Sequence, residues 1–251
     1  MNHTTYSFII STLAGLTTLI GALTIFIKSD KRNDIICYSL SFSAGIMITI
    51  SIIDLIPTSL KYLKDTYNVI PSILITTLFI VIGIILSFFI KKIIPEKKDD
   101  NNKLFRTGLL SMIVLILHNI PEGIATFITS MNDITFGITL ALAISFHNIP
   151  EGISIAIPIY YSTNSKIKPF IYTFIAGISE LLGAFITYKF LYKYMNNLIL
   201  SSLFAIIAGL MIHISMSELL PSAKEYGSIN RIMKAIICAI ILMIMCHYLL
   251  Q

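Results

Sequence analysis

Long apolar stretches alternate with short polar segments along the whole of this chain. Eight stretches are each roughly 20 residues long, which is the length that an α-helix needs to cross a bilayer. We place them at about residues 6–27, 35–56, 69–90, 107–129, 134–158, 169–188, 198–220 and 232–250. The pattern predicts an all-α integral membrane protein with eight transmembrane helices, in a single transmembrane domain over residues 1–251.

The composition agrees with this prediction. Hydrophobic residues make up 56% of the chain and charged residues only 12%, and the mean hydropathy is +0.86, as is typical of membrane domains. The stretches use most of the 251 residues and leave no room for a soluble catalytic domain. No Lys or Arg precedes the first stretch, so we expect a retained helix and not a signal peptide.

The basic residues indicate how the chain is oriented. Most of them fall in connections on one side of the membrane, including a cluster within 91–106, whereas the other side holds only Lys61, Lys64, Lys189 and Lys193. Connections rich in Lys and Arg stay in the cytoplasm. We therefore expect 91–106 to be a cytoplasmic loop and both termini to lie outside a multi-pass protein of the cytoplasmic (inner) membrane. The net charge of +5 reflects this excess of basic residues on one side of the membrane. The lipid bilayer is an expected partner, and nucleic acid is not.

Two segments recur in the second half of the chain. LAGLTTLIGAL (13–23) resembles IAGISELLGAF (175–185), and GIMITISIIDLIP (45–57) resembles GLMIHISMSELLP (209–221). Since the copies lie five spans apart, they run in opposite directions through the membrane. Such an inverted repeat is typical of transporters with a substrate site near the midplane. We expect spans 1–3 and 6–8 to form the repeat around spans 4 and 5, although spans 3 and 8 show no convincing match.

The fourth and fifth stretches each contain the hexapeptide HNIPEG, beginning at His118 and His147. Because residues advance by about 100° along a helix, the histidine, asparagine and glutamate of each copy fall in one sector. Pro121 and Pro150 each remove one backbone hydrogen bond beside these side chains. The glycine that ends each copy allows another backbone to approach closely.

These residue types favour a metal site. A carboxylate buried in a membrane costs several kcal/mol unless it is paired or binds a cation. Imidazole and carboxylate ligands suit Zn²⁺ and its first-row neighbours, and the absence of cysteine from the motif argues against copper(I). The alternative is that His–Glu hydrogen bonds merely lock the fourth and fifth spans together, although that role does not require both prolines.

The motifs together resemble the ZIP family of divalent-metal transporters, and its bacterial zinc-uptake branch in particular. The resemblance rests on eight spans, HNxPEG in the fourth and fifth, SExxG in the sixth, and an acidic residue three positions before the proline that ends the second and the seventh. It covers essentially the whole chain. In this family the first, fourth, fifth and sixth spans are described as moving like an elevator against the other four.

The resemblance implies a two-metal site at the membrane centre, in which the metal ions are the transported substrates. The residues that match the first metal position are His118, Glu122, His147 and Glu151. Those that match the second are Asn119, Asn148 and Glu180, with Glu122 and Glu151 shared. The family also implies import of Zn²⁺ and related ions such as Fe²⁺, Mn²⁺, Co²⁺ or Cd²⁺, no organic cofactor, and a homodimer.

Four further residues are candidates for the transport path. Met47 falls at a pathway-lining position of the family, although ordinary packing would explain it equally well. Asp54 and Glu218 are equivalent in the repeat and end their spans at opposite mouths, as entry and exit ligands or as helix-end carboxylates that meet water. His213 lies in the middle of the seventh span, either as an exit ligand or as a packed, hydrogen-bonded histidine.

Two other functions could use a buried cluster of this kind. An intramembrane metal-dependent hydrolase normally carries HExxH, which supplies a glutamate as general base, and this chain has no such motif. A metal-gated channel is the second alternative. A carrier gives saturable metal uptake into liposomes, whereas a hydrolase cleaves a substrate and moves nothing. We expect a transporter and not an enzyme.

Overall fold

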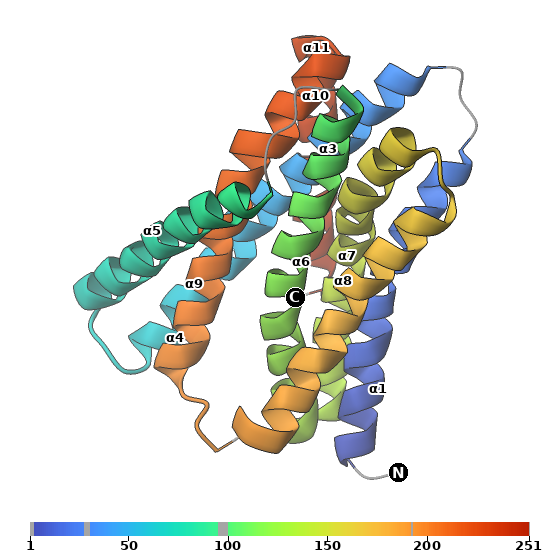
Figure 1. Ribbon diagram of the computed structural model, residues 1–251. Coiled ribbons are helices and arrows are strands. Elements are labelled where there is room, and N and C mark those ends of the chain that lie inside the picture. The colour runs from blue at the N-terminus through green and yellow to red at the C-terminus, as the bar shows by residue number, and fades with distance from the viewer. Residues whose placement is uncertain (1–2, 28–30, 95–99, 192, 251) are drawn as a thin grey trace.

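The structure is a computed structural model that describes residues 3–27, 31–94, 100–191 and 193–250. Within these residues, eight helical spans are long and apolar enough to cross a membrane, which confirms the predicted fold class. Figure 1 shows them as a set of long, tilted helices. In chain order the spans are His3–Phe26, Arg32–Lys64, Val69–Lys92, Asn102–Asn132, Ile134–Thr163, Ile167–Leu191, Asn197–Tyr226 and Ile229–Leu249.

Four of these spans contain more than one helical element. Span 1 contains α1 (His3–Leu16), α2 (Thr18–Ala22) and the 3₁₀ turn η1 (Leu23–Phe26), and span 2 contains α3 (Arg32–Ile50), the π-helical turn η2 (Ser51–Leu55) and α4 (Ile56–Lys64). Spans 3, 4 and 5 are α5 (Val69–Ile93), α6 (Asp100–Asn132) and α7 (Ile134–Thr163). Span 6 contains α8 (Ile167–Ile186) and the π-helical turn η3 (Thr187–Leu191). Span 7 contains α9 (Asn197–Ile214), the π-helical turn η4 (Ser215–Leu219) and α10 (Leu220–Tyr226), and span 8 is α11 (Ile229–Leu250).

Several helices extend beyond the stretches predicted from hydropathy. The second span has 33 residues and is therefore about 50 Å long, against a hydrocarbon core of about 30 Å. Helix also enters the segment 91–106 that we expect to be a loop, since α5 ends at Ile93 and α6 begins at Asp100. Residues 95–99 of that predicted loop lie outside the described residues. Charged residues near the end of a helix lower the hydropathy without ending the helix.

The eight spans pack as two bundles of four. The first bundle consists of spans 1, 4, 5 and 6, in which α1, α6, α7 and α8 all contact one another. The second bundle consists of spans 2, 3, 7 and 8, in which α5 packs on α9 and α3 packs on α11. Figure 1 shows α1, α6, α7 and α8 on the right, with α4, α5 and α9 on the left. The bundles meet mainly where α3 lies against α7 and α6 lies against α9.

Glycines hold each bundle together by close backbone contact. At each of the twelve glycines, an added Cβ would collide with a residue of the same bundle. Gly15 and Gly177 face each other's carbonyl oxygens where α1 crosses α8. Gly83 meets the backbone of Ile206 in the second bundle. Since such contacts bring helices to their closest approach, each bundle is more tightly built than the boundary between the two.

The inverted repeat has a counterpart in local structure. The π-helical turns Ser51–Leu55 and Ser215–Leu219 occupy equivalent positions of the two repeated segments. A proline, Pro57 or Pro221, follows each turn within the first turn of the next helix. Proline supplies no backbone N–H and crowds the preceding turn, so the regular α-helical hydrogen bonding is interrupted at this place in both halves.

Spans 3 and 8, for which the sequence shows no match, occupy equivalent places in the two halves. The α5 helix packs on α9 at Gly209, and α11 packs on α3 at Gly45, the residue equivalent to Gly209 in the repeat. These two spans are also the least buried of the eight spans in the described residues. A helix that mostly faces lipid needs only to stay apolar, so its sequence can diverge while its position is kept.

Candidate metal centre

The two HNIPEG copies lie side by side where α6 and α7 cross. Both helices continue through the internal prolines Pro121 and Pro150. His147 Nε2 lies 2.8 Å from Glu122 Oε1, and His118 Nε2 lies 3.2 Å from the same oxygen. Each helix therefore contributes to a single cluster, in which the two copies of the motif meet.

Four side chains form the centre of this cluster. Ligand atoms of His118, Glu122 and His147 all lie within 4.8 Å of one another, and His118 Nε2 lies 3.4 Å from Glu151 Oε1. All four side chains are buried. Ligand atoms around a tetrahedral Zn²⁺ lie about 3.3 Å apart, given metal–ligand distances near 2.0 Å. The four side chains would therefore need only small shifts to bind one ion.

The asparagines of the motif are held by hydrogen bonds from their amide nitrogens, and their amide oxygens accept none from the described residues. Asn119 Nδ2 donates to the carbonyl oxygen of Ala176 at 2.9 Å, and Asn148 Nδ2 donates to that of Ala14 at 3.1 Å. Ala14 and Ala176 are equivalent in the inverted repeat. Each bond turns one amide nitrogen toward a neighbouring helix, and both Oδ1 atoms are buried without a hydrogen-bond partner among the described residues.

Glu180 brings a third buried carboxylate from α8. Its Oε2 atom accepts a hydrogen bond of 3.3 Å from Asn148 Nδ2, and its side chain is fully buried. Close approach of α8 depends on Gly123, where an added Cβ would collide with the carbonyl oxygen of Glu180. The equivalent contact in the other half of the repeat joins Gly152 to Thr18. The motif glycines thus allow the close helix contact predicted for them.

Five buried side-chain oxygen atoms of this cluster accept no hydrogen bond from the described residues. Within the described residues they are Glu122 Oε2, Glu151 Oε1, Glu180 Oε1, Asn119 Oδ1 and Asn148 Oδ1. Buried polar atoms are nearly always hydrogen-bonded, and each exception needs an explanation. The hydrogen bonds and ion pairs described for the carboxylates come from histidines and an asparagine. A set of negative and neutral oxygen atoms of this kind suits a divalent cation.

A cavity of about 670 Å³ leads to this cluster from one end of the molecule. It reaches His147 and lies between α7 of the first bundle and η2, α4 and α11 of the second. Asp54 and Lys61 line it, and His247 lies near the end of α11. Asp54 Oδ1 accepts a hydrogen bond from Thr58 Oγ1 at 3.3 Å. One predicted path residue therefore lies on an open approach to the cluster.

Met47 and His213 both lie among packed side chains, and their place on a transport path stays a prediction. Met47 is fully buried, and Ser215 Oγ donates a hydrogen bond to its sulfur at 3.5 Å. His213 Nδ1 lies 2.5 Å from Ser87 Oγ and 3.4 Å from Ser217 Oγ, and its ring lies against that of Phe88 at a tilt of 47°. Of the two hypotheses for His213, the contacts described here match the packed, hydrogen-bonded histidine.

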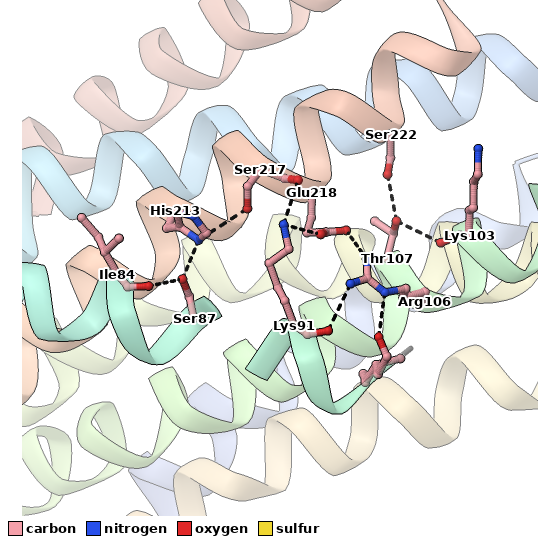
Figure 2. A network of polar contacts seen from close by, with 11 residues as sticks. Ile84, Ser87, Lys91, Lys103, Arg106, Thr107, His213, Ser217, Glu218 and Ser222 are labelled. Atoms are coloured by element: carbon pink, nitrogen blue, oxygen red, sulfur yellow. Dashed lines mark hydrogen bonds and ion pairs between the residues drawn. The ribbon is translucent and has the colours of Figure 1, made fainter. Parts of the chain in front are cut away.

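Glu218 lies at the opposite end of the molecule, in an arrangement that sequence analysis did not foresee. Figure 2 shows its carboxylate between two cationic side chains. Arg106 Nη1 donates to Glu218 Oε2 at 2.8 Å, and Lys91 Nζ lies 2.7 Å from Glu218 Oε1. We assigned both basic residues to a loop. One signal in the sequence could have shown that Arg106 lies in a helix and not in a loop. It directly precedes the apolar stretch 107–129, and a helix can begin before such a stretch and include the charged residue.

Comparison with known proteins identifies the family. The family model described as ZIP Zinc transporter matches residues 96–246. The chain is 38% identical to the Zinc transporter ZupT of Streptococcus mutans serotype c, over 96% of both chains. It is 34% identical to the Zinc transporter ZupT of Clostridium perfringens, over 97% of this chain and 95% of that one.

The chain belongs to the ZIP family. The resemblance inferred from the HNxPEG motifs is therefore confirmed, at nearly full length. A further relative, the Zinc transporter ZupT of Campylobacter jejuni subsp. jejuni, is 34% identical over 94% of both chains. Membership identifies this protein as a transporter and not an enzyme, so the hydrolase alternative is not favoured.

Proposed function

We propose that this protein imports Zn²⁺ and related divalent cations, such as Fe²⁺, Mn²⁺, Co²⁺ and Cd²⁺, into the cytoplasm by alternating access. The observation that carries the proposal is the buried ligand cluster at the crossing of α6 and α7, with its oxygen atoms that lack hydrogen-bond partners among the described residues. The zinc transporters named among the relatives support Zn²⁺ as the first substrate to test.

The first metal would bind to the nitrogen-containing part of the cluster. His118 and His147 each supply an imidazole nitrogen, and Glu122 lies in contact with both. Glu151 completes the set of four from α7. Binding requires neutral imidazoles and ionised carboxylates, so loading of the metal releases protons and weakens at acid pH.

The second metal would bind to oxygen atoms alone. Asn119, Asn148 and Glu180 each have a buried oxygen atom without a hydrogen-bond partner among the described residues. Glu122 and Glu151 have one such oxygen each and can bridge the two metals. Since neutral amide oxygens are weaker ligands than imidazoles for zinc, we expect the second metal to be held less tightly.

The cavity and the basic residues support one direction of transport. The cavity approaches His147 from the end that we expect to face outside, where Lys61 is one of few basic residues. The other end carries most of the Lys and Arg residues, which favours a cytoplasmic location. This arrangement corresponds to a state that is open to the outside, with both termini on the outer side of the cytoplasmic membrane.

The two bundles supply the moving parts. The whole cluster belongs to the first bundle, and the close glycine contacts lie within bundles, so the first bundle can carry bound metal as a rigid body. Movement against the second bundle would close the cavity at His147 and open the other end. This division matches the elevator-like displacement described for the family.

The direct test is uptake by purified protein in proteoliposomes, measured with radioactive Zn²⁺ and with competing Fe²⁺, Mn²⁺, Co²⁺ and Cd²⁺. We expect saturable uptake that the competing ions reduce. A flux that rises without saturation as the metal concentration increases would support the metal-gated channel. No uptake above protein-free liposomes would refute metal transport altogether.

A further inference from the structure

The residues around Glu218 join the two bundles at the end of the molecule opposite the cavity. Arg106 belongs to α6 of the first bundle, whereas Lys91 and Glu218 belong to α5 and η4 of the second. An ion pair joins α6 to η4, in which Arg106 Nη1 lies 2.8 Å from Glu218 Oε2. Figure 2 shows Arg106 enclosed by Glu218 and by the ends of the neighbouring helices.

The pair is buried and fully engaged. Arg106 is 8% exposed and Glu218 is 7% exposed. Arg106 Nε also donates to the carbonyl oxygen of Ile94 at 2.9 Å, and its Nη2 atom donates to that of Lys91 at 3.2 Å. Removing one partner from a buried ion pair is strongly unfavourable because the other charge is left uncompensated. Separation of α6 from α9 and η4 therefore meets a specific electrostatic barrier.

Two further contacts lie beside the pair and cross the same boundary. Thr107 Oγ1 lies 2.8 Å from Ser222 Oγ, and Lys103 Nζ lies 3.6 Å from Glu225 Oε1. Lys103 and Thr107 are on α6, and Ser222 and Glu225 are on α10 of the second bundle. The first turns of α6 are thus attached to the end of span 7 at three successive points.

The equivalent residue at the other mouth is in a different state. Asp54 corresponds to Glu218 in the inverted repeat, yet its described hydrogen bond comes from Thr58 in its own span, and it lines the open cavity. Glu218 is covered by Arg106 and Lys91 instead. Of two carboxylates that are equivalent by sequence, one therefore lines an open cavity and the other is covered by cationic side chains.

We propose that Arg106 is a gating residue, and that its ion pair with Glu218 closes the cytoplasmic mouth and must break in every transport cycle. This proposal rests on the proposed transport function and adds the element that keeps the exit shut. While Arg106 and Lys91 neutralise Glu218, the carboxylate cannot accept a departing metal ion. Movement of the first bundle withdraws Arg106, which frees one oxygen of Glu218 at the moment when the exit opens.

A reversible disulfide tests whether this contact has to open. Thr107 and Ser222 would be replaced by cysteine in a variant whose three native cysteines are serine, since the two hydroxyl oxygens lie 2.8 Å apart across the boundary. We expect oxidation to stop Zn²⁺ uptake into proteoliposomes and reduction to restore it, while Zn²⁺ still binds to the oxidised protein. The proposal would be overturned if the oxidised variant took up Zn²⁺ as fast as the same variant after reduction. Failure of the disulfide to form would also overturn it.

A matched pair within one bundle provides the control. Ser59 Oγ and Ser201 Oγ also lie 2.8 Å apart, but both residues belong to the second bundle. The Ser59→Cys, Ser201→Cys variant should transport equally well when oxidised and when reduced. If the unmodified protein transports no metal, the proposed function fails. If it transports and the oxidised Thr107→Cys, Ser222→Cys variant does too, only the gate fails.

The role of Arg106 itself is tested by labelling. In Arg106→Gln the closed mouth loses its ion pair, and a cysteine at Ser222 should react with an impermeant maleimide from the cytoplasmic side on the order of tenfold faster. Arg106→Lys retains a charge and should give a smaller increase. A labelling rate that is unchanged in Arg106→Gln would contradict the gating role, even if transport were slower.

Discussion

The carboxylate of Glu180 has no equivalent in the other half of the repeat, where Thr18 occupies its place between two glycines. Both residues are buried, and both backbones contact a motif glycine, Gly123 for Glu180 and Gly152 for Thr18. Helix packing therefore tolerates threonine at this position. The acid at Glu180 requires another explanation, and the oxygen atoms beside it suggest a metal that is bound by oxygen alone.

We expect Glu180→Thr to reduce the number of bound Zn²⁺ ions from two to one per protomer. The His118 and His147 site would remain, since Glu180 has no described hydrogen bond or ion pair with either histidine, so transport would persist with a changed rate or selectivity. Bound metal is measured by elemental analysis after equilibrium dialysis, alongside uptake by the same preparation. Two metals still bound, or complete loss of transport in a folded variant, would contradict this division between the two sites.

Close contacts between helices at glycine residues hold the cluster in place. Two glycines of α6 have different surroundings. An added Cβ at Gly123 would collide with the backbone of Glu180, which cannot move without the whole of α8. At Gly108 the nearest atoms are those at the end of the Ile159 side chain, which can rotate away. Two identical substitutions in one helix should therefore have different consequences.

Gly123→Ala should destabilise the protein by about 1–3 kcal/mol, as overpacking of a buried contact usually does, and should also weaken metal binding by pushing Glu180 away. Gly108→Ala is the control and should bind metal like the unmodified protein. Thermal unfolding in detergent, with and without Zn²⁺, measures both effects. Equal behaviour of the two variants would show that close approach of α8 does not position the site.

At the level of these elements, there is a physical reason why some features could be predicted from the sequence and others could not. The spans and the two HNIPEG faces could be predicted because apolar length and helical periodicity are local properties of the sequence. The pairing of Glu218 with Arg106 and Lys91 could not be predicted, since it joins residues more than 100 positions apart. The equivalence of spans 3 and 8 could not be predicted from the sequence either, because a helix that faces lipid needs only to stay apolar and its sequence can diverge.

At the scale of the whole molecule, the direction of transport depends on which end faces the cytoplasm. A cavity that reaches His147 opens at one end. Arg106 and Glu218 form a buried pair at the other end, where a second cavity of about 660 Å³ lies between spans 1 and 5 of the first bundle and spans 2 and 8 of the second. The bias of basic residues favours a cytoplasmic location for that second end. The direction of transport and the functions of entry and exit assigned to Asp54 and Glu218 both follow from that assignment.

Cysteine labelling in cells tests this topology. In a variant without the native cysteines, Asn132→Cys at the end of α6 should react with an impermeant reagent from outside, because we expect the cavity end to face out. Lys224→Cys, on the exposed surface of α10, should react only after the membrane is permeabilised. The reverse pattern would invert the direction and exchange the roles of Asp54 and Glu218.

The central claim is that metal crosses the membrane through the cluster that Glu122 connects. Its most direct test is Zn²⁺ uptake by the Glu122→Ala variant in proteoliposomes. The control is Asp65→Ala, a substitution at an exposed acidic residue after α4. Because Glu122 contacts both histidines, we expect its loss to lower uptake by on the order of 100-fold or more, beyond the usual effect of losing a supporting residue outside the ligand set. Asp65→Ala should transport normally. Uptake at the unmodified rate by a well-folded Glu122→Ala protein would contradict the claim.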